Sequence, residues 1–194
     1  MARWDPGTEE RLKKAALELF GEHGYEQVTV TQIAERAGIT RRSFFRYYPD
    51  KREVLFAGSE QLPPAAAEAV LAADPDAPAL TAVLDALAPI GTRLVEDLDH
   101  IAERRAVIDA SPELQERERT KTAAVGAAIR DALGQRGVPD DRAKLVAQLA
   151  TVVFQNAFER WIEARGEQDF AACLDAIAAS VRESVAGMGE SPGD

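Results

Sequence analysis

The sequence predicts an all-α protein, with a three-helix N-terminal helix-turn-helix domain followed by a larger helical domain. Alanine, leucine, glutamate and arginine dominate almost every segment, and strand-like alternation is missing apart from residues 28–30. Charge is unevenly placed: residues 1–60 contain ten basic and ten acidic side chains, whereas residues 61–194 contain 13 basic and 23 acidic ones. A polyanion should therefore repel the larger part, and only the N-terminal part could approach one.

Length and composition narrow the class of protein. The chain has 194 residues, a formal net charge of −10 and a share of hydrophobic residues that is ordinary for a globular protein. Its single cysteine, Cys173, excludes an intramolecular disulfide and suits a reducing compartment. The start of the chain, MARWDPGTEER, lacks the apolar core of a signal peptide, and no apolar run approaches the ~20 residues that span a bilayer. We therefore expect a cytoplasmic location.

The first two helices follow from apolar spacing and from a capping signal. Apolar residues recur three and four apart over about residues 9–21, which predicts the first helix. Thr29 is expected to cap the second helix, at residues 30–37, and Gln32 completes a capping box. This capping signal favours a helix over a strand at the valine-rich segment.

A glycine and a proline delimit the third helix. Gly38 is expected to turn the chain, and Thr40 to cap a helix over residues 41–47. Pro49 should end this helix, because the residue before a proline avoids helical backbone angles.

The remaining chain is expected to be helical up to its tail. Asp50 should cap a fourth helix, which Pro63 and Pro64 should bend or break. Residues 188–194 are expected to form a disordered tail. Further helices are expected at about residues 80–98, 101–110, 113–133, 141–164 and 170–185.

A basic and aromatic segment surrounds the third helix. It contains one acidic residue, Asp50, and six basic residues: Arg36, Arg41, Arg42, Arg46, Lys51 and Arg52. Phe44 and Tyr48 share one helix face, which can pack into a core, whereas the arginines fall on the other side. Such a helix suits the major groove of duplex DNA, although a run of this kind can also be a solvated face.

Each candidate DNA-contacting residue has a chemical role. Arginine can donate two hydrogen bonds to a guanine, Ser43 can bond a base edge or a phosphate, and Phe45 can touch a thymine methyl. Tyr47 and Lys51 can reach phosphates, as can the amides of helices capped by residues such as Thr29. The full candidate set is Thr29, Thr40, Arg41, Arg42, Ser43, Phe45, Arg46, Tyr47 and Lys51.

Three motifs in residues 8–55 carry a family resemblance. AALELFGEHGYEQVTV, IAERAGIT and SFFRYYPDKREVL occur in this order, and the segment resembles the N-terminal domain of TetR-family transcriptional regulators. The resemblance assigns Lys51 to phosphate binding, and assigns recognition to Arg41, Arg42, Ser43, Phe45, Arg46 and Tyr47. Many members have a small residue or proline where this chain has Arg42, so an operator preference cannot be borrowed from a relative.

The resemblance also implies a domain plan and a set of partners. Residues 1–55 would bind DNA, and residues 56–187 would form a helical effector-binding and dimerisation domain. The protein would be a homodimeric repressor that binds a pseudo-palindromic operator and is released from it by a small apolar effector.

Two late helices carry stripes that suit a dimer interface. The helix from about residue 141 has a small apolar stripe and a bulky one, which includes Leu145, Leu149 and Val152. Intrachain packing is the alternative account of these stripes. The residues expected at the interface are Val146, Ala150, Val153 and Ala157, with Phe170, Leu174, Ile177 and Val181 from the last helix.

A few residues of the larger domain are candidates for effector binding. Phe154, Phe158 and Trp161 could line an apolar site, and Asn156 or Arg104 could anchor a polar group. For each of them a structural role is the alternative: core packing for the aromatic residues, a core hydrogen bond for Asn156 and a surface ion pair for Arg104.

The sequence offers no catalytic constellation. His23 and His100 lack ligand-like spacing with cysteines or carboxylates, and no phosphate-binding glycine loop or nucleophile-elbow motif occurs. We therefore expect no catalytic residue, metal or cofactor. The alternative function is a helical small-molecule-binding or scaffold protein whose basic patch binds an acidic protein.

Overall fold

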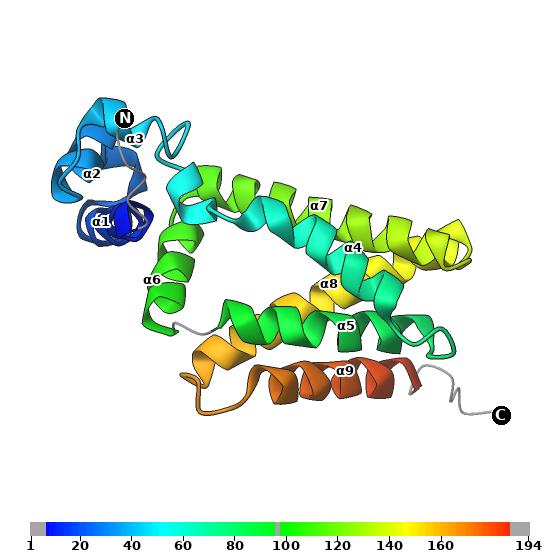
Figure 1. Cartoon of the computed structure of the whole chain (residues 1–194). Coiled ribbons are helices and arrows are strands. Elements are labelled where there is room, and N and C mark those ends of the chain that lie inside the picture. The colour runs from blue at the N-terminus through cyan, green and yellow to red at the C-terminus, as the bar shows by residue number, and fades with distance from the viewer. Residues whose placement is uncertain (1–6, 96–97, 187–194) are drawn as a thin grey trace. The chain divides into compact units, whose positions relative to one another are not determined.

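The structure, a computed structural model, describes residues 7–95 and 98–186, and every regular element in these ranges is a helix (Figure 1). The predicted all-α fold class is therefore confirmed. The α-helices are α1 (Gly7–His23), α2 (Val30–Arg36), α3 (Arg41–Phe44), α4 (Leu62–Ala72), α5 (Ala79–Leu94), α6 (Leu98–Asp109), α7 (Pro112–Gln135), α8 (Asp140–Glu163) and α9 (Phe170–Ala186). Three short 3-10 helices are η1 (Tyr25–Gln27), η2 (Glu53–Phe56) and η3 (Ser59–Gln61).

The chain forms two compact units, each built from two segments. The first unit comprises residues 1–60 and 99–120, and the second comprises residues 61–98 and 121–194. By packing, α6 and the start of α7 thus belong with the N-terminal helices. A DNA-binding domain that ends at residue 55 remains a proposal about function, and the expected tail from residue 188 lies outside the described residues.

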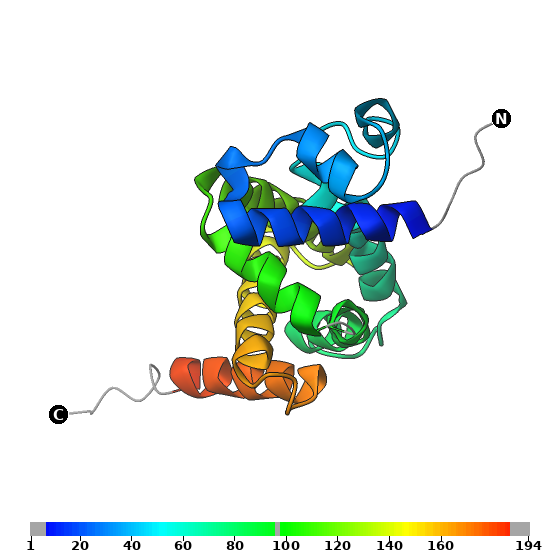
Figure 2. The ribbon, with the colours of Figure 1, turned by 90° about the vertical axis from the view of Figure 1, so that its left-hand side faces the viewer.

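One apolar core holds the first unit together. α1 contributes Leu12 and Phe20, and α2 contributes Ile33, all of them buried. Ile108 of α6 and Leu114 of α7 enter the same core from the second segment of the unit. Figure 2 shows α6 passing beside α1, so the N-terminal helices rest on residues about 90 positions later in the chain.

The capping residues and the glycine turn of the sequence predict the helices of the helix-turn-helix closely. The capping box of Thr29 and Gln32 is confirmed, and α2 begins at Val30. Gly38 turns the chain with a φ of +73°, a backbone conformation that favours glycine. α3 ends at Phe44, earlier than expected, because the amides of Arg46 and Tyr47 bond the carbonyls three residues before them and tighten the chain.

The fourth helix is a correction to the sequence expectation. Asp50 caps as expected, since its Oδ1 accepts the Glu53 amide proton at 3.0 Å. The capped segment is only the short η2, however, because the chain is extended at Ala57 and turns at Gly58, where φ is +81°. Pro63 and Pro64 then lie in the first turn of α4, where the absence of an amide proton costs little. The two prolines therefore begin a helix instead of bending one.

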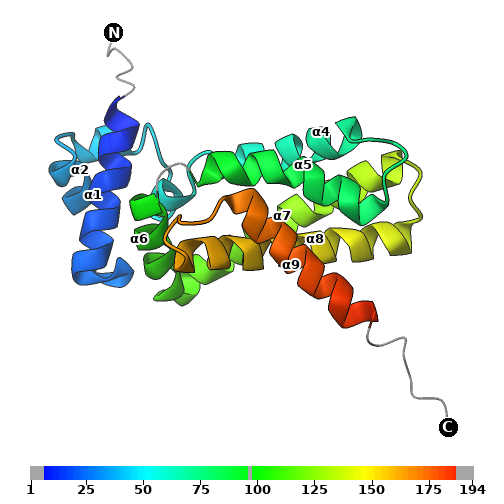
Figure 3. The same cartoon turned by 90° about the horizontal axis from the view of Figure 1, so that it is seen from below.

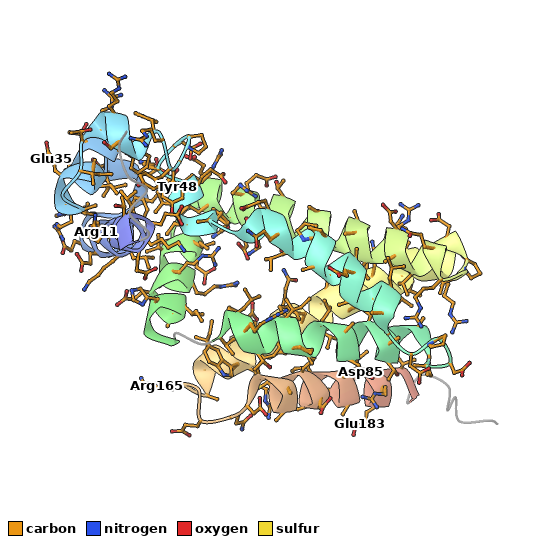
Figure 4. The ribbon with its side chains drawn as sticks, in the orientation of Figure 1. Arg11, Glu35, Tyr48, Asp85, Arg165 and Glu183 are labelled. Atoms are coloured by element: carbon orange, nitrogen blue, oxygen red, sulfur yellow. The ribbon has the colours of Figure 1, made fainter. Side chains whose placement is uncertain are left out.

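The second unit is a layered helical bundle. α5 contacts α4, α8 and α9, and α9 crosses α8 (Figure 3). Phe170 of α9 lies so close to Gly91 of α5 that a Cβ atom at Gly91 would be 2.0 Å from the ring. The five helices expected after residue 80 are confirmed, with ends shifted by a few residues. Charged side chains such as Asp85, Arg165 and Glu183 are exposed (Figure 4).

Among the helices in the described ranges, none combines the length and the hydropathy needed to cross a membrane.

Candidate DNA interface

α3 is held by a cap at its start and by buried aromatic rings. Thr40 Oγ1 accepts the Ser43 amide proton at 3.1 Å and lies 3.0 Å from the Ser43 hydroxyl oxygen. Phe44 is fully buried, and its ring lies 5.9 Å from that of buried Tyr48 (labelled in Figure 4). Thr40 and Ser43 therefore shape the helix in this structure, and their hydroxyl groups are bonded to each other.

The outer side of α3 and of the turn after it is basic. Arg41, Arg42 and Arg46 are exposed, and so is Phe45, whose side chain is 46% accessible. The Arg41 guanidinium lies 5.5 Å from the centre of the Phe45 ring, which is a cation–π geometry. Within the described part of the chain, Arg42 and Arg46 have no ion-pair partner. These cations are free to meet an anionic ligand.

Two further arginines of the basic segment are already paired. Arg36 bonds Glu18 and Glu22 of α1, at 3.2 Å in each case, and this bonding lowers the pKa of Glu22. Arg52 lies 3.3 Å from both Asp50 and Glu53. These side chains tie elements of the first unit together, and their charges are largely compensated.

Lys51 lies on backbone oxygens instead of facing outwards. Its Nζ donates to the carbonyl oxygens of Tyr25 at 2.6 Å, Val28 at 2.9 Å and Glu26 at 3.4 Å. The same nitrogen lies 4.2 Å from the centre of the Tyr25 ring. Tyr47, the other expected phosphate contact, is half-buried, and Thr29 is engaged in its capping box.

A polar network in the first unit could not be found from sequence. Arg117 of α7 donates to both carboxylate oxygens of Glu53, at 2.8 and 3.0 Å, and this bond lowers the pKa of Glu53. Arg104 of α6 donates to the Leu55 carbonyl at 2.7 Å. Both guanidinium groups lie 5.0 Å from the centre of the Phe56 ring. The partners are 49 and 64 residues apart in the chain, so no local spacing indicates them.

The expected effector residues do not come together in one site. Arg104 belongs to the first unit and also bonds Glu118 at 3.2 Å, whereas Phe154, Phe158 and Trp161 lie in the second. Asn156 is exposed, and its amide donates to the Val152 carbonyl of the same helix at 2.9 Å.

The aromatic candidates do form a cluster in the second unit. The ring of Phe170 lies 5.2 Å from that of Phe154 and 6.5 Å from that of Phe158, which in turn lies 6.2 Å from that of Trp161. Phe154 and Phe158 are half-buried, whereas Trp161 is buried. An apolar ligand could therefore reach only part of this cluster without rearrangement.

The expected dimer residues differ in accessibility. Ile177 and Val181 of α9 are half-buried. The others are covered within the chain itself: Val146, Ala150, Val153, Ala157, Phe170 and Leu174. The bulky stripe of α8 is open instead, with Leu145 56% and Val152 51% accessible.

The described residues offer little for other chemistry. They contain no group of three or more histidine, cysteine, aspartate or glutamate side chains that could hold a metal ion. Cys173 is buried, which raises the pKa of its thiol, and its sulfur lies 3.6 Å from an oxygen of Gln168.

An all-helical chain with a capped helix-turn-helix, and with arginines exposed on its second helix, has the architecture of a DNA-binding regulator. The comparisons agree with this class: residues 12–57 match the model of the bacterial regulatory proteins of the tetR family, and residues 77–186 match the model of the MftR C-terminal domain. The chain belongs to the TetR family of transcriptional regulators. Members of this family bind operator DNA, typically as dimers, and respond to small-molecule effectors.

Individual relatives match over different lengths. The transcriptional regulator MftR of Mycobacterium tuberculosis is 45% identical over 47 residues, which are 24% of each chain. The alignment thus spans about a quarter of this curated relative. Two solved structures share the fold over nearly the whole chain. SmeT of Stenotrophomonas maltophilia, in complex with triclosan, is 19% identical with a TM-score of 0.62, and the match covers 90% of this chain and 91% of that one. FadR of Thermus thermophilus, in complex with lauroyl-CoA, is 23% identical with a TM-score of 0.53. The match covers 96% of this chain and 98% of the FadR chain.

The Glu53–Arg117 pair leads to a pH-dependent stability prediction. Glu53→Gln should lower the stability of the first unit near neutral pH by about 1–2 kcal/mol, because it weakens a two-bond contact between charged groups. Pairing lowers the pKa of Glu53 in the folded state, so the stabilisation is complete above the unfolded pKa of about 4.3. It should be lost as the pH falls through the lower folded pKa. The measurement is thermal unfolding of both proteins over a series of acidic and neutral pH values.

The matched control is Glu116→Gln, since Glu116 is an exposed carboxylate of the same unit that pairs with Arg119. This variant should unfold like the wild type at every pH. A Glu53→Gln defect that stays constant into the acid range would show that the ion pair is not its cause.

Proposed function

We propose that this chain is a ligand-responsive, sequence-specific DNA-binding regulator that acts as a repressor. The observation that carries this proposal is the exposed arginine surface of α3 on an otherwise acidic protein. The segment after residue 60 has an excess of ten acidic residues, so phosphate repulsion favours contact through the helix-turn-helix alone.

Arg42 and Arg46 are the proposed base-reading residues. Arg42 lies in α3 and Arg46 in the turn after it, and both side chains are exposed. Each can donate two hydrogen bonds to O6 and N7 of a guanine in the major groove. Arg41 is stacked on the Phe45 ring. In the proposed complex, Arg41 supports this ring while Phe45 contacts a thymine methyl.

The protein is proposed to bind DNA as a homodimer. Two recognition helices must lie about 34–36 Å apart to enter successive major grooves. The open stripe of Leu145, Leu149 and Val152 on α8 is the favoured contact surface, together with Ile177 and Val181 of α9. These side chains are accessible in one chain, whereas the small stripe of α8 is covered.

The effector is proposed to be a small apolar molecule that contacts the aromatic cluster of Phe154, Phe158, Trp161 and Phe170. Two solved structures with this fold contain ligands, triclosan in SmeT and lauroyl-CoA in FadR, and each ligand has an apolar part: the aromatic rings of triclosan and the acyl chain of lauroyl-CoA. An effector acts only through a difference between its affinities for the DNA-binding state and the released state of the dimer. It must therefore favour a spacing of the two helix-turn-helix motifs that does not fit the operator.

Selection of bound duplexes from a random pool tests DNA reading and yields the operator. We expect a palindromic consensus. Arg42→Ala and Arg46→Ala should each relax the preference at particular base pairs and cost about 1–3 kcal/mol of specific binding, because a two-bond contact with a guanine is lost. The measurement is titration of the consensus duplex and of duplexes changed at single positions.

Arg119→Ala serves as the matched control, because it removes an exposed arginine of the first unit that pairs with Glu116. It should retain the sequence preference of the wild type. Two outcomes would contradict sequence-specific binding. The duplexes selected from the pool could share no consensus, or the bound duplex could be displaced both by excess nonspecific DNA and by an acidic protein.

The dimer proposal rests on the open stripe of α8. Leu145→Glu or Val152→Glu should raise the dimer dissociation constant by about tenfold or more, since burial of an unpaired charge costs at least ~1.4 kcal/mol. Light scattering over a concentration series measures this change. Leu71→Glu applies the same substitution at an exposed leucine of α4, and should leave the dimer intact. A wild-type protein that is monomeric at micromolar concentration would contradict the proposal.

The effector proposal requires reciprocal coupling. A ligand that lowers operator affinity must itself bind more weakly, by the same factor, when operator is saturating. We expect such a ligand to change the fluorescence of Trp161, measured in a Trp4→Phe background so that one tryptophan reports. Ligand affinities that are equal with and without operator would show that the ligand tested is not an inducer.

A further inference from the structure

A buried serine hydroxyl in the first unit makes no hydrogen bond. Among the described residues, two buried side-chain oxygens lack a hydrogen-bond partner, Tyr48 Oη and Ser111 Oγ. Ser111 directly precedes α7, a position where a serine side chain usually accepts an amide proton of the first helical turn. Here the Ser111 carbonyl accepts the Gln115 amide proton at 3.0 Å, but the hydroxyl forms no such cap. A buried hydroxyl costs free energy unless a water molecule or a ligand pairs with it.

Ser111 also lines a cavity of about 210 Å³. One wall of this cavity consists of residues 20–27, at the end of α1 and in η1. The other wall consists of Val107, Ala110 and Ser111, at the corner where α6 meets α7. Figure 2 shows the end of α1 beside this corner. All lining residues belong to the first unit, whereas the aromatic cluster belongs to the second.

The inner part of the cavity is apolar apart from the unpaired hydroxyl. Phe20, Tyr25 and Val107 are buried lining residues, and the rings of Phe20 and Tyr25 lie 5.2 Å apart. The Tyr25 hydroxyl is already used, since it donates to Glu113 of α7 at 2.9 Å. A ligand with an apolar body and one hydrogen-bonding group therefore matches this wall, because its polar group can pair with Ser111.

Size and charge narrow the class of ligand. A cavity of ~150 Å³ can hold benzene, so the larger volume here has room for one six-membered ring with small substituents. The buried lining residues are uncharged, so a charged ring would lose its hydration without gaining a partner. The mouth includes the exposed carboxylate of Glu26, which repels an anion. A neutral ring is thus the best match.

We propose that this cavity is a second small-molecule site, located in the DNA-binding unit, and that it takes a neutral single-ring aromatic compound whose hydroxyl group bonds Ser111. A ligand hydroxyl suits a serine hydroxyl because each can donate to or accept from the other. The site goes beyond the proposed function, since it uses neither the arginine surface of α3 nor the aromatic cluster of the second unit.

Two fluorinated probes of similar size test the hydrogen bond. The probes para-fluorophenol and para-fluorotoluene differ only in the group that would meet Ser111, a hydroxyl or a methyl. Fluorine NMR titration of the free protein measures both affinities. Ser111→Ala should lower the affinity for the phenol, relative to that for the toluene, by about tenfold, because only the phenol loses a hydrogen bond.

Substitutions to phenylalanine test the location of the site. Ala110→Phe places a ring at the cavity and should weaken para-fluorophenol binding by about tenfold or more, because the ring takes up space that the probe needs. Ala123→Phe adds the same ring at an exposed position of α7 outside the cavity, and should leave the affinity unchanged. Phe158→Ala removes a ring of the aromatic cluster and should also leave it unchanged.

The wild-type protein supplies a readout that needs no variant. Bound para-fluorophenol should shift the methyl signals of Val107 and Ala110 in a proton–carbon NMR spectrum. Absence of these shifts at millimolar probe, or a response confined to the second unit around Trp161, would overturn the proposal. So would a ratio of the two affinities that Ser111→Ala leaves unchanged, or a Ser111→Ala variant that loses thermal stability and both probes equally, which would make Ser111 a cap of α7. None of these outcomes affects the duplex selection that tests the proposed function.

Discussion

The DNA-facing surface depends on the burial of one aromatic ring. α3 has only four residues, and a helix of this length has no stability of its own in water. Phe44, which has no accessible surface, fixes the helix to the core, and Tyr48 packs on the same side. Thr40 shapes the first turn by accepting an amide proton. The exposed arginines therefore project from a short helix whose opposite side is packed into the core.

Contacts within the first unit leave only some of its basic side chains available to bind an anionic ligand. The sequence places six basic residues within a short segment, but the fold uses Arg36 and Arg52 in ion pairs and directs Lys51 at carbonyl oxygens. These contacts hold α1, α2 and η2 in place, while positive charge is left mainly on α3 and the turn after it. The fold therefore concentrates the uncompensated positive charge of the helix-turn-helix on α3 and the turn after it.

The elements that the sequence predicts correctly are those with local signals. The cap residues Thr29 and Thr40 and the apolar spacing of α1 each depend on residues within a turn or two, so they place the helices without knowledge of the fold. Asp50 also caps as the sequence predicts, but the chain after it forms only the short η2, because the backbone turns at Gly58.

The remaining features of the site depend on residues that are distant in the chain. Lys51 meets carbonyl groups 23 to 26 residues before it, and Arg104 meets a carbonyl 49 residues away. A basic residue in a basic segment shows no sign of such partners. The stripe of α8 that stays open could not be chosen from sequence either, because both stripes have the same helical period and the fold buries only the small one.

The contact between Gly91 and Phe170 has a consequence for the history of this protein. The ring occupies the space that any larger residue at position 91 would need. A mutation of either position alone leads to a clash or to a cavity beside the aromatic cluster, whereas a paired change conserves the total volume. Across descendants of this chain, positions 91 and 170 should therefore vary together, so the close packing of α5 on α9 would be inherited as a property of two residues on separate helices.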